Sequence, residues 1–265
     1  MSENINRLYH YTSFEAFVHI FDYQLDCVSN HNMIDLRFGN PVNMNDKNEI
    51  AFFEKFFFTG SKISNEIAEL YTKLKKKMPF PYIFSLIHHV GSKWYPKDEI
   101  PMWFMYGGKA TGVRIAFDFK QIEKFCENNN YLLKECQYVN QGEMKNIASN
   151  CRERIKKTKR EDWNEALKKT YIDSLCYKTK DWTYEQEYRI VACGNNDKTF
   201  CICPEEKYKY LHVAFPLKAV KEVTIGPLAD KIVANRCIEL LTNELFSKVS
   251  SLKAFDIKVS KLQIR

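Results

Sequence analysis

Residues 182–191 have the sequence WTYEQEYRIV, which combines two glutamates and an arginine with aromatic and β-branched side chains. The aromatic and β-branched side chains predict a strand from Tyr184 to Cys193. Because side chains alternate along a strand, Glu185, Glu187 and Arg189 would project from one face. Charged groups gathered in this way can line a polar cleft, in which Arg189 holds one carboxylate and leaves the other free for chemistry. The alternative is an ordinary solvated face.

The chain as a whole has the composition of a globular protein. It contains 265 residues, of which 45% are hydrophobic and 14% aromatic, enough for a substantial core. There is no internal repeat and no linker, so we expect one α+β domain over residues 1–265, with a mixed, largely antiparallel central sheet flanked by helices. The stretch at about residues 143–176 predicts a basic helical insertion, either as one long helix or as two helices with a break near Thr158.

Several kinds of protein are disfavoured by what the sequence lacks. The N-terminal residues contain no apolar signal segment, and no window reaches about 18 consecutive apolar residues, so we expect a cytoplasmic protein without a membrane partner. The nine cysteines are scattered, without the paired spacing of a zinc site, and we expect no metal site. The glycine-rich spacings that cradle nucleotide phosphates do not occur, so a standard phosphate loop is not expected.

Positive charge is concentrated in one part of the sequence. The formal net charge is +7, and most of the excess lies between residues 145 and 160. Such a patch attracts phosphates, which predicts nucleic-acid binding, whereas a solvated helix face is the structural alternative. The predicted nucleic-acid-binding residues are Arg152, Arg154, Lys156, Lys157, Lys159 and Arg160.

The remaining signal is a set of short motifs in a fixed order. They lie at Leu8–Ser13, at the Asn-rich loop Asn40–Glu49, at Trp103–Asp118, at Trp182–Arg189 and at Val220–Pro227. Their order and spacing resemble a bacterial family that is classed as a domain of unknown function (DUF2971-like). The resemblance covers most of the chain, and its strongest part is the W-x-x-E-x-E-Y-R motif.

That family is similar in layout to the ADP-ribosyltransferases, which are glycosyltransferases that use NAD as a substrate. The resemblance implies an ADP-ribosyltransferase-like fold in which Glu185 or Glu187 is the catalytic carboxylate. Glu187 is preferred, because Arg189 follows it on the same predicted face. The implied cofactor-binding residues are His10, Tyr11, Thr12, Asn43, Asn45, Trp103, Tyr106 and Arg189.

These residue types suit the transfer of ADP-ribose. Breaking the bond between nicotinamide and ribose builds an oxocarbenium-like centre, which a nearby carboxylate stabilises. An aromatic ring, Trp103 or Tyr106, can stack on the nicotinamide. The resemblance implies a bacterial toxin or antiphage defence effector that modifies a nucleic-acid or protein acceptor and is paired with an antitoxin or another defence-system partner.

Two other functions are open from the sequence. The first is a nucleic-acid- or partner-binding defence module without catalysis, whose site is the basic stretch. The second is a metal-dependent phosphodiesterase that uses Asp46, Glu49, Glu185 and Glu187, since carboxylate clusters suit divalent cations. For single residues the structural alternatives are a capping role for His10 and a core position for Trp103.

Overall fold

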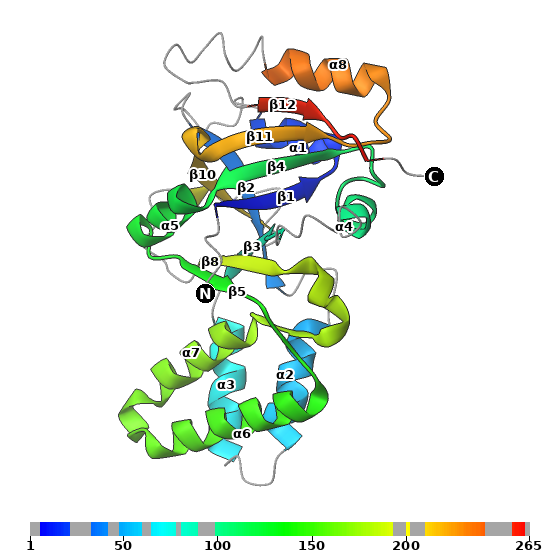
Figure 1. Ribbon diagram of the computed structural model, residues 1–265. Helices are drawn as coiled ribbons and strands as arrows, with labels where there is room; N and C mark the ends of the chain where they lie inside the picture. Colours follow the sequence, from blue (N-terminus) through cyan, green and yellow to red (C-terminus); the bar gives the residue numbers. More distant parts are fainter. Residues whose placement is uncertain are drawn as a thin grey trace.

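A sheet of ten strands forms the centre of the described structure (Figure 1). The computed structural model describes residues 6–21, 33–41, 48–59, 65–77, 81–89, 99–192, 200–201, 210–241 and 256–262. Within these ranges the strand pairs of the sheet are antiparallel, apart from one parallel pair at the edge, and helices pack on both faces. The predicted α+β fold, with a mixed and largely antiparallel sheet flanked by helices, is therefore confirmed.

Neighbouring strands of the sheet come from distant parts of the sequence. In sheet order they are β12 (Asp256–Val259), β11 (Val220–Ile225), β4 (Val113–Asp118), β1 (Arg7–Thr12), β3 (Tyr82–Ile87), β2 (Met33–Gly39), β10 (Tyr210–Pro216) and β9 (Phe200–Cys201). Beside β3 lies β8 (Glu187–Ala192), and beside β8 lies β5 (Leu132–Glu135). The parallel edge pair is β11 with β12.

Strand β3 is the junction of the sheet, because two strands share one of its edges. Tyr9 of β1 pairs with Ile87 near one end of that edge, and Gly39 of β2 pairs with Ile83 near the other. The opposite edge of β3 pairs with β8 along its whole length, and this pairing ends with Ile87 opposite Glu187. The end of β3 thus brings the first strand of the chain close to the carboxylate motif.

The two faces of the sheet differ in what covers them. One face is apolar and is covered by α1 (Phe14–Phe21), α5 (Phe119–Asn128) and α8 (Lys231–Glu239). The other face, near β8, packs against the helical group that is seen below the sheet in Figure 1. This group consists of α2 (Asn48–Thr59), α3 (Asn65–Lys77), α6 (Gln141–Lys157) and α7 (Trp163–Ser174).

Local signals in the sequence explain where the helices begin and end. Ser13 accepts a hydrogen bond from the Ala16 amide, which caps α1. Asn140 and Glu143 form a capping box at the start of α6. Thr158 is extended and ends α6, so the charged stretch forms two helices with a break near Thr158, joined by a short 3-10 turn. None of the helices in the described ranges is long and apolar enough to cross a membrane.

Candidate active site

The W-x-x-E-x-E-Y-R motif is only partly a strand, and this corrects the sequence prediction. Residues Lys180–Glu185 form a 3-10 helix (η4), and β8 begins at Glu187. Between them Gln186 has a left-handed backbone with φ of 43°. The physical reason is that the left-handed backbone of Gln186 takes the chain out of the extended conformation, so the ladder with β3 ends at Ile87 opposite Glu187, and one hydrogen bond from the His88 amide to the Gln186 carbonyl follows it. Glu185 therefore projects from a turn and not from the same strand face as Glu187.

Both carboxylates and the arginine of this motif are buried. Glu185, Glu187 and Arg189 are 2%, 4% and 2% exposed, so the interpretation as a solvated face is wrong. Buried charges are stable only when opposite charges and hydrogen bonds compensate them. Arg189 meets that need for Glu187 with two parallel bonds, from Nε to Oε1 at 2.8 Å and from Nη2 to Oε2 at 2.9 Å.

A lysine that the sequence analysis did not single out completes the network. Lys178 lies on β7 (Tyr177–Thr179), a short strand that pairs with β6 (Gln137–Val139), and it is 4% exposed. Its ammonium donates to Glu187 Oε2 at 3.0 Å and forms an ion pair with Glu185. Two cations thus face two carboxylates in a site with almost no solvent contact.

The two carboxylates are electrostatically unequal. Burial alone would raise the pKa of Glu187, but the charges of Arg189 and Lys178 and hydrogen bonds from Arg189 and Ser85 lower it to about 2. Burial raises the pKa of Glu185 above its ordinary value, although Lys178 and a hydrogen bond from Tyr106 oppose this shift. Pairs of carboxyl groups with opposite shifts are typical of acid–base sites. Arg189 and Lys178 therefore hold Glu187 as an anion, whereas burial favours the neutral form of Glu185.

Tyr106 connects Glu185 with the surface. Its hydroxyl donates to Glu185 Oε1 at 2.6 Å, while the residue as a whole is 36% exposed. Phe104, Met105 and Tyr184 are exposed as well. The hydroxyl of Tyr184 lies 3.2 Å from the Met105 sulfur, which joins η4 to the end of α4 (Glu99–Met105).

Trp103 does not share this exposure. Its side chain is fully buried and packs against Tyr11 with a ring-centroid distance of 4.9 Å. The ring packs with Ile87 and Met102 in a small hydrophobic cluster that is separate from the two larger cores. The prediction that Trp103 stacks on a cofactor is therefore replaced by its structural alternative, and Tyr106 is the aromatic residue that reaches both solvent and Glu185.

In the H-Y-T segment of β1 the side chains alternate between the two faces of the sheet, and of the three only Tyr11 shares the face of Glu187. His10 stacks on Phe84 at 4.5 Å, and its Nδ1 contacts the carbonyl of Ser85 at 3.1 Å. Burial lowers the pKa of His10 to about 4, against the opposing effect of that carbonyl. Tyr11 projects to the other face, where its hydroxyl meets His89 Nε2 at 2.8 Å, and Thr12 is buried.

Part of the predicted site belongs to the Asn-rich loop Asn40–Glu49. Asn43, Asn45 and Asp46 lie outside the described residues, and Glu49 lies in the first turn of α2 with its side chain undescribed. Among the residues with described positions, no group of three or more His, Cys, Asp or Glu side chains is placed to hold a metal ion. Lys178 occupies the position between Glu185 and Glu187 that a cation would take.

The predicted nucleic-acid-binding residues are corrected at one position. Arg152 is 9% exposed, and its Nη1 donates to the carbonyls of Phe56 at 2.6 Å and Phe57 at 3.2 Å, near the end of α2. Such carbonyls lack helical partners and carry partial negative charge, which explains why they hold a buried arginine. Arg152 is therefore a structural residue and not a nucleic-acid contact.

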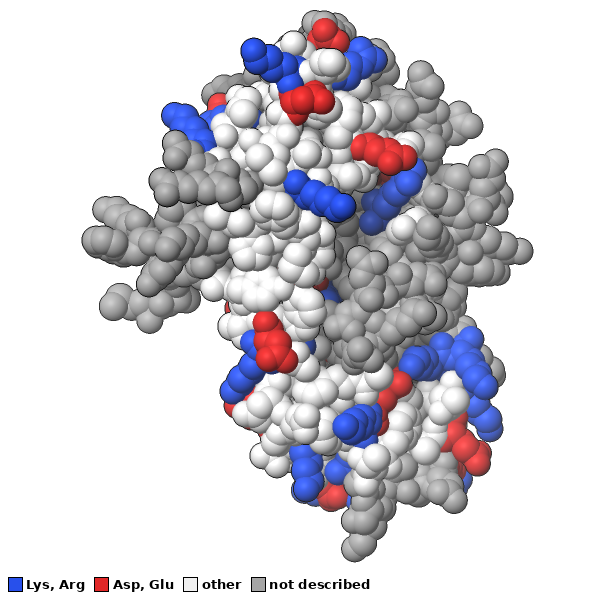
Figure 2. Space-filling view, turned by 90° about the vertical axis from the view of Figure 1, so that its right-hand side faces the viewer, with Lys and Arg blue, Asp and Glu red and all other residues white. Residues whose placement is uncertain are grey.

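The other five basic residues are exposed, and several are paired. Arg154 contacts Thr170, and the ion pairs in this region are Lys156 with Glu153, Lys159 with Glu161 and Arg160 with Glu66. Lys157 is exposed as well. Figure 2 shows the same mixture, with basic and acidic side chains interspersed over the lower, helical part of the molecule. The surface is therefore less positive than the sequence suggests.

We compared the chain with curated proteins and with solved structures. A search of the curated proteins found no match. Among solved structures the chain is similar to Thermus sp. 2.9 DarT in complex with NAD+, with 9% identity over 98% of each chain and a TM-score of 0.36. It is similar also to that DarT in complex with ADP-ribosylated ssDNA, with 8% identity over 97% of this chain and 95% of the other and a TM-score of 0.36.

Part of the chain matches the model of a protein family. The matching family is described as a protein of unknown function (DUF2971), and the match covers residues 102–190. This segment contains all members of the buried network, from Tyr106 through Lys178 to Arg189. The chain thus matches the DUF2971 family over the segment that builds the candidate site, as its sequence motifs predict.

Proposed function

We propose that this protein is an NAD-dependent ADP-ribosyltransferase in which Glu185 is the reactive carboxylate. The observation that carries the proposal is the pair of unequal buried carboxylates, of which only Glu185 is joined to the surface through Tyr106. Glu187 is held on both oxygens by Arg189 and is bonded to Lys178, so it serves as a fixed anion that positions Lys178.

The proposed reaction needs a carboxylate that can both stabilise charge and take up a proton. Nicotinamide leaves with the electron pair of its bond to ribose, and the ribose carbon becomes cationic. The acceptor then bonds to that carbon and loses its proton to Glu185. A raised pKa makes Glu185 a better base for this step than an ordinary surface carboxylate. The ring of the half-exposed Tyr106 is placed to stack on the departing nicotinamide.

We propose a nucleic-acid acceptor, recruited by the exposed basic residues Lys156, Lys157 and Lys159. These side chains are open to solvent, and phosphate contacts of this kind give a salt-sensitive, sequence-independent attraction. The biological role that accompanies this chemistry would be that of a cytoplasmic bacterial toxin or antiphage defence effector, held in check by an antitoxin or another defence-system partner. A protein acceptor is the alternative that the same assay distinguishes.

The test is release of nicotinamide from NAD by the purified protein, with DNA, RNA and protein offered as acceptors. We expect Glu185→Gln to abolish turnover while leaving NAD affinity nearly unchanged. Glu135→Gln is the matched control, because it removes an exposed carboxylate from the neighbouring strand β5, where Glu135 contacts Tyr188. Absence of NAD binding by folded wild-type protein would refute the proposal. It would favour the alternative, a nucleic-acid- or partner-binding module without catalysis.

A further inference from the structure

Strand β12 forms one edge of the sheet. It pairs in parallel with β11, from Glu222 with Asp256 to Ile225 with Val259, and within the described ranges no strand pairs with its other side. Figure 1 shows β12 at the opposite end of the molecule from the helical group. An edge strand presents backbone N–H and C=O groups that can pair with a strand of another chain.

The backbone of β12 shows which of its residues face the open side. The Ser260 amide donates to the Ile225 carbonyl at 2.9 Å, so the backbone groups of Ser260 point toward β11. Because these groups alternate in direction along a strand, those of Asp256 and Lys258 point toward β11 as well. The N–H and C=O groups of Ile257 and Val259 therefore point to the open side.

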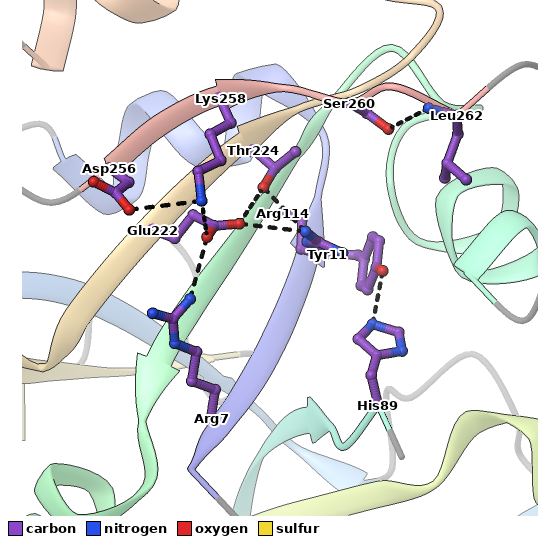
Figure 3. Close-up of polar contacts among 10 residues, drawn as sticks. All are labelled: Arg7, Tyr11, His89, Arg114, Glu222, Thr224, Asp256, Lys258, Ser260 and Leu262. Carbon is purple, nitrogen blue, oxygen red and sulfur yellow. Dashed lines mark hydrogen bonds and ion pairs between the residues drawn. The ribbon is translucent and has the colours of Figure 1, made fainter. Parts of the chain in front are cut away.

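The side chains on one face of β12 carry opposite charges. Asp256 and Lys258 lie on the face of Glu222, as Figure 3 shows, with 3.6 Å between Oδ2 and Nζ. Their side chains are 65% and 54% exposed. Lys258 also binds Glu222 at 2.8 Å, but Glu222 shares its charge with two arginines, Arg7 and Arg114. The exposed edge thus presents one negative and one positive side chain, two residues apart.

This spacing makes β12 complementary to an antiparallel copy of itself. In a two-fold arrangement the outward-facing residues exchange the hydrogen bonds, so Ile257 pairs either with Ile257 or with Val259 of the second copy. Pairing with Val259 places Lys258 opposite itself, which is unfavourable. Pairing with Ile257 places each Asp256 opposite Lys258 of the other copy. These are non-hydrogen-bonded pairs, in which opposite side chains lie closest.

Exposed apolar side chains lie on the elements beside the same edge. Leu228 precedes α8, Val259 is the last residue of β12, and both are exposed. Ile232, in the first turn of α8, is 80% exposed, and Figure 1 shows α8 alongside β12. Two-fold pairing at the edge keeps both α8 helices on the same face of the joined sheet, where these side chains gain apolar partners.

We propose that β12 pairs with β12 of a second copy of this chain, so that two sheets form one continuous sheet with Ile257 at the two-fold axis. The interface is isologous, and each contact between Asp256 and Lys258 therefore occurs twice. Strands β11, β4, β1 and β3 separate β12 from β8, which begins at Glu187. The inference thus goes beyond the proposed function and does not depend on it.

The test is the molar mass of the purified protein in solution, from sedimentation equilibrium at concentrations up to about 100 μM. At that concentration a dimer with a Kd of about 1 μM is almost complete. We expect twice the mass of one chain for the wild type. Asp256→Lys and Lys258→Asp each place like charges opposite each other at two positions, so each should weaken the association about tenfold or more. Lys124→Glu is the control, because it reverses an exposed lysine on α5.

An equal mixture of the two interface variants makes the test specific. A copy with Asp256→Lys and a copy with Lys258→Asp again place opposite charges at both positions, so the mixture should form the dimer that neither variant forms alone. A wild type that is monomeric at about 100 μM would overturn the inference. A dimer that folded Asp256→Lys retains, or a mixture of folded variants that stays monomeric, would also overturn it. Absence of nicotinamide release bears only on the proposed function.

Discussion

The hydroxyl of Tyr106 donates to Glu185 across 2.6 Å and joins this half-exposed residue to a buried carboxylate. The two residues are 79 positions apart in sequence, at the end of α4 and in η4. This bond favours the ionised form of Glu185, because the carboxylate accepts from a neutral donor. Through this hydrogen bond, Tyr106 lowers the pKa of Glu185 and opposes the effect of burial.

Tyr106→Phe tests this relationship while keeping the aromatic ring. Loss of the hydrogen bond should raise the pKa of Glu185 further, so the acid limb of the pH–activity profile should move to higher pH. We expect nicotinamide release at neutral pH to fall about five- to tenfold. Tyr184→Phe is the control, because its hydroxyl contacts the Met105 sulfur and not Glu185. Equal profiles for both variants would contradict a role for the Tyr106 bond.

Glu187 should make the stability of the protein sensitive to acid. Its pKa in the folded state is lowered to about 2, whereas an unfolded glutamate takes up a proton near pH 4.3. The stabilisation is therefore complete above that pH and is lost as the pH falls toward 2. It amounts to about 3 kcal/mol. Urea unfolding at a series of pH values should show a steep loss for the wild type.

The matched variants for this prediction are Glu187→Gln and Glu161→Gln. Glu187→Gln should already be less stable at pH 7 by about 3–5 kcal/mol, because Lys178 and Arg189 lose their buried counter-charge, and it should lose less on acidification. Glu161 is exposed and forms a long ion pair with Lys159, so its variant should follow the wild type. If the free energy of unfolding fell equally with pH in Glu187→Gln and in the wild type, Glu187 would not be the source of the acid sensitivity.

Arg152 and Lys157 lie on the same helix and should behave in opposite ways. Arg152→Met breaks two hydrogen bonds to the end of α2 and leaves the Phe56 and Phe57 carbonyls without this donor. We expect a loss of about 2–4 kcal/mol in the free energy of unfolding. Lys157→Met, at an exposed position, should change stability by about 0.5 kcal/mol or less. Denaturant titrations check both values, and a neutral Arg152 variant would contradict its structural role.

His10 should give the wild type a second pH dependence, at milder acidity. Its folded pKa is lowered to about 4, and the unfolded side chain is protonated near pH 6.5, so the unfolded state binds the extra proton between these values. Stability should therefore fall as the pH drops from 6.5 to 4. His10→Phe keeps the ring contact with Phe84 and should reduce this slope, leaving the part that His89 contributes because burial lowers its pKa to about 3. His19→Gln, at an exposed position on α1, should keep the full slope.

The sequence predicts regular elements well where local patterns are strong. The break that the sequence predicts near Thr158 matches the observed end of α6. The start of β8 could not be predicted, because it depends on the left-handed backbone of Gln186. Lys178 was missed because only the short β6–β7 pairing places it between two carboxylates.

A signal for Arg152 was present in the sequence. On α6 the buried residues Met144, Ala148, Cys151 and Ile155 recur at helical spacing, and Arg152 lies on the same stripe. The periodicity therefore separates Arg152 from its exposed neighbours, although composition alone groups them. What the sequence could not supply is the partner, because the carbonyls that bind Arg152 are about 95 residues away.

The position of β2 in the sheet has a consequence for synthesis on the ribosome. Its long pairing is with β10, which begins about 170 residues after β2 ends, while β3 meets it at one position only. At usual translation rates β10 is made roughly 10–35 s after β2. During that time β2 is a nascent hydrophobic strand without its main partner, and such strands attract other chains. Newly made protein should therefore depend on chaperones until β10 has been translated.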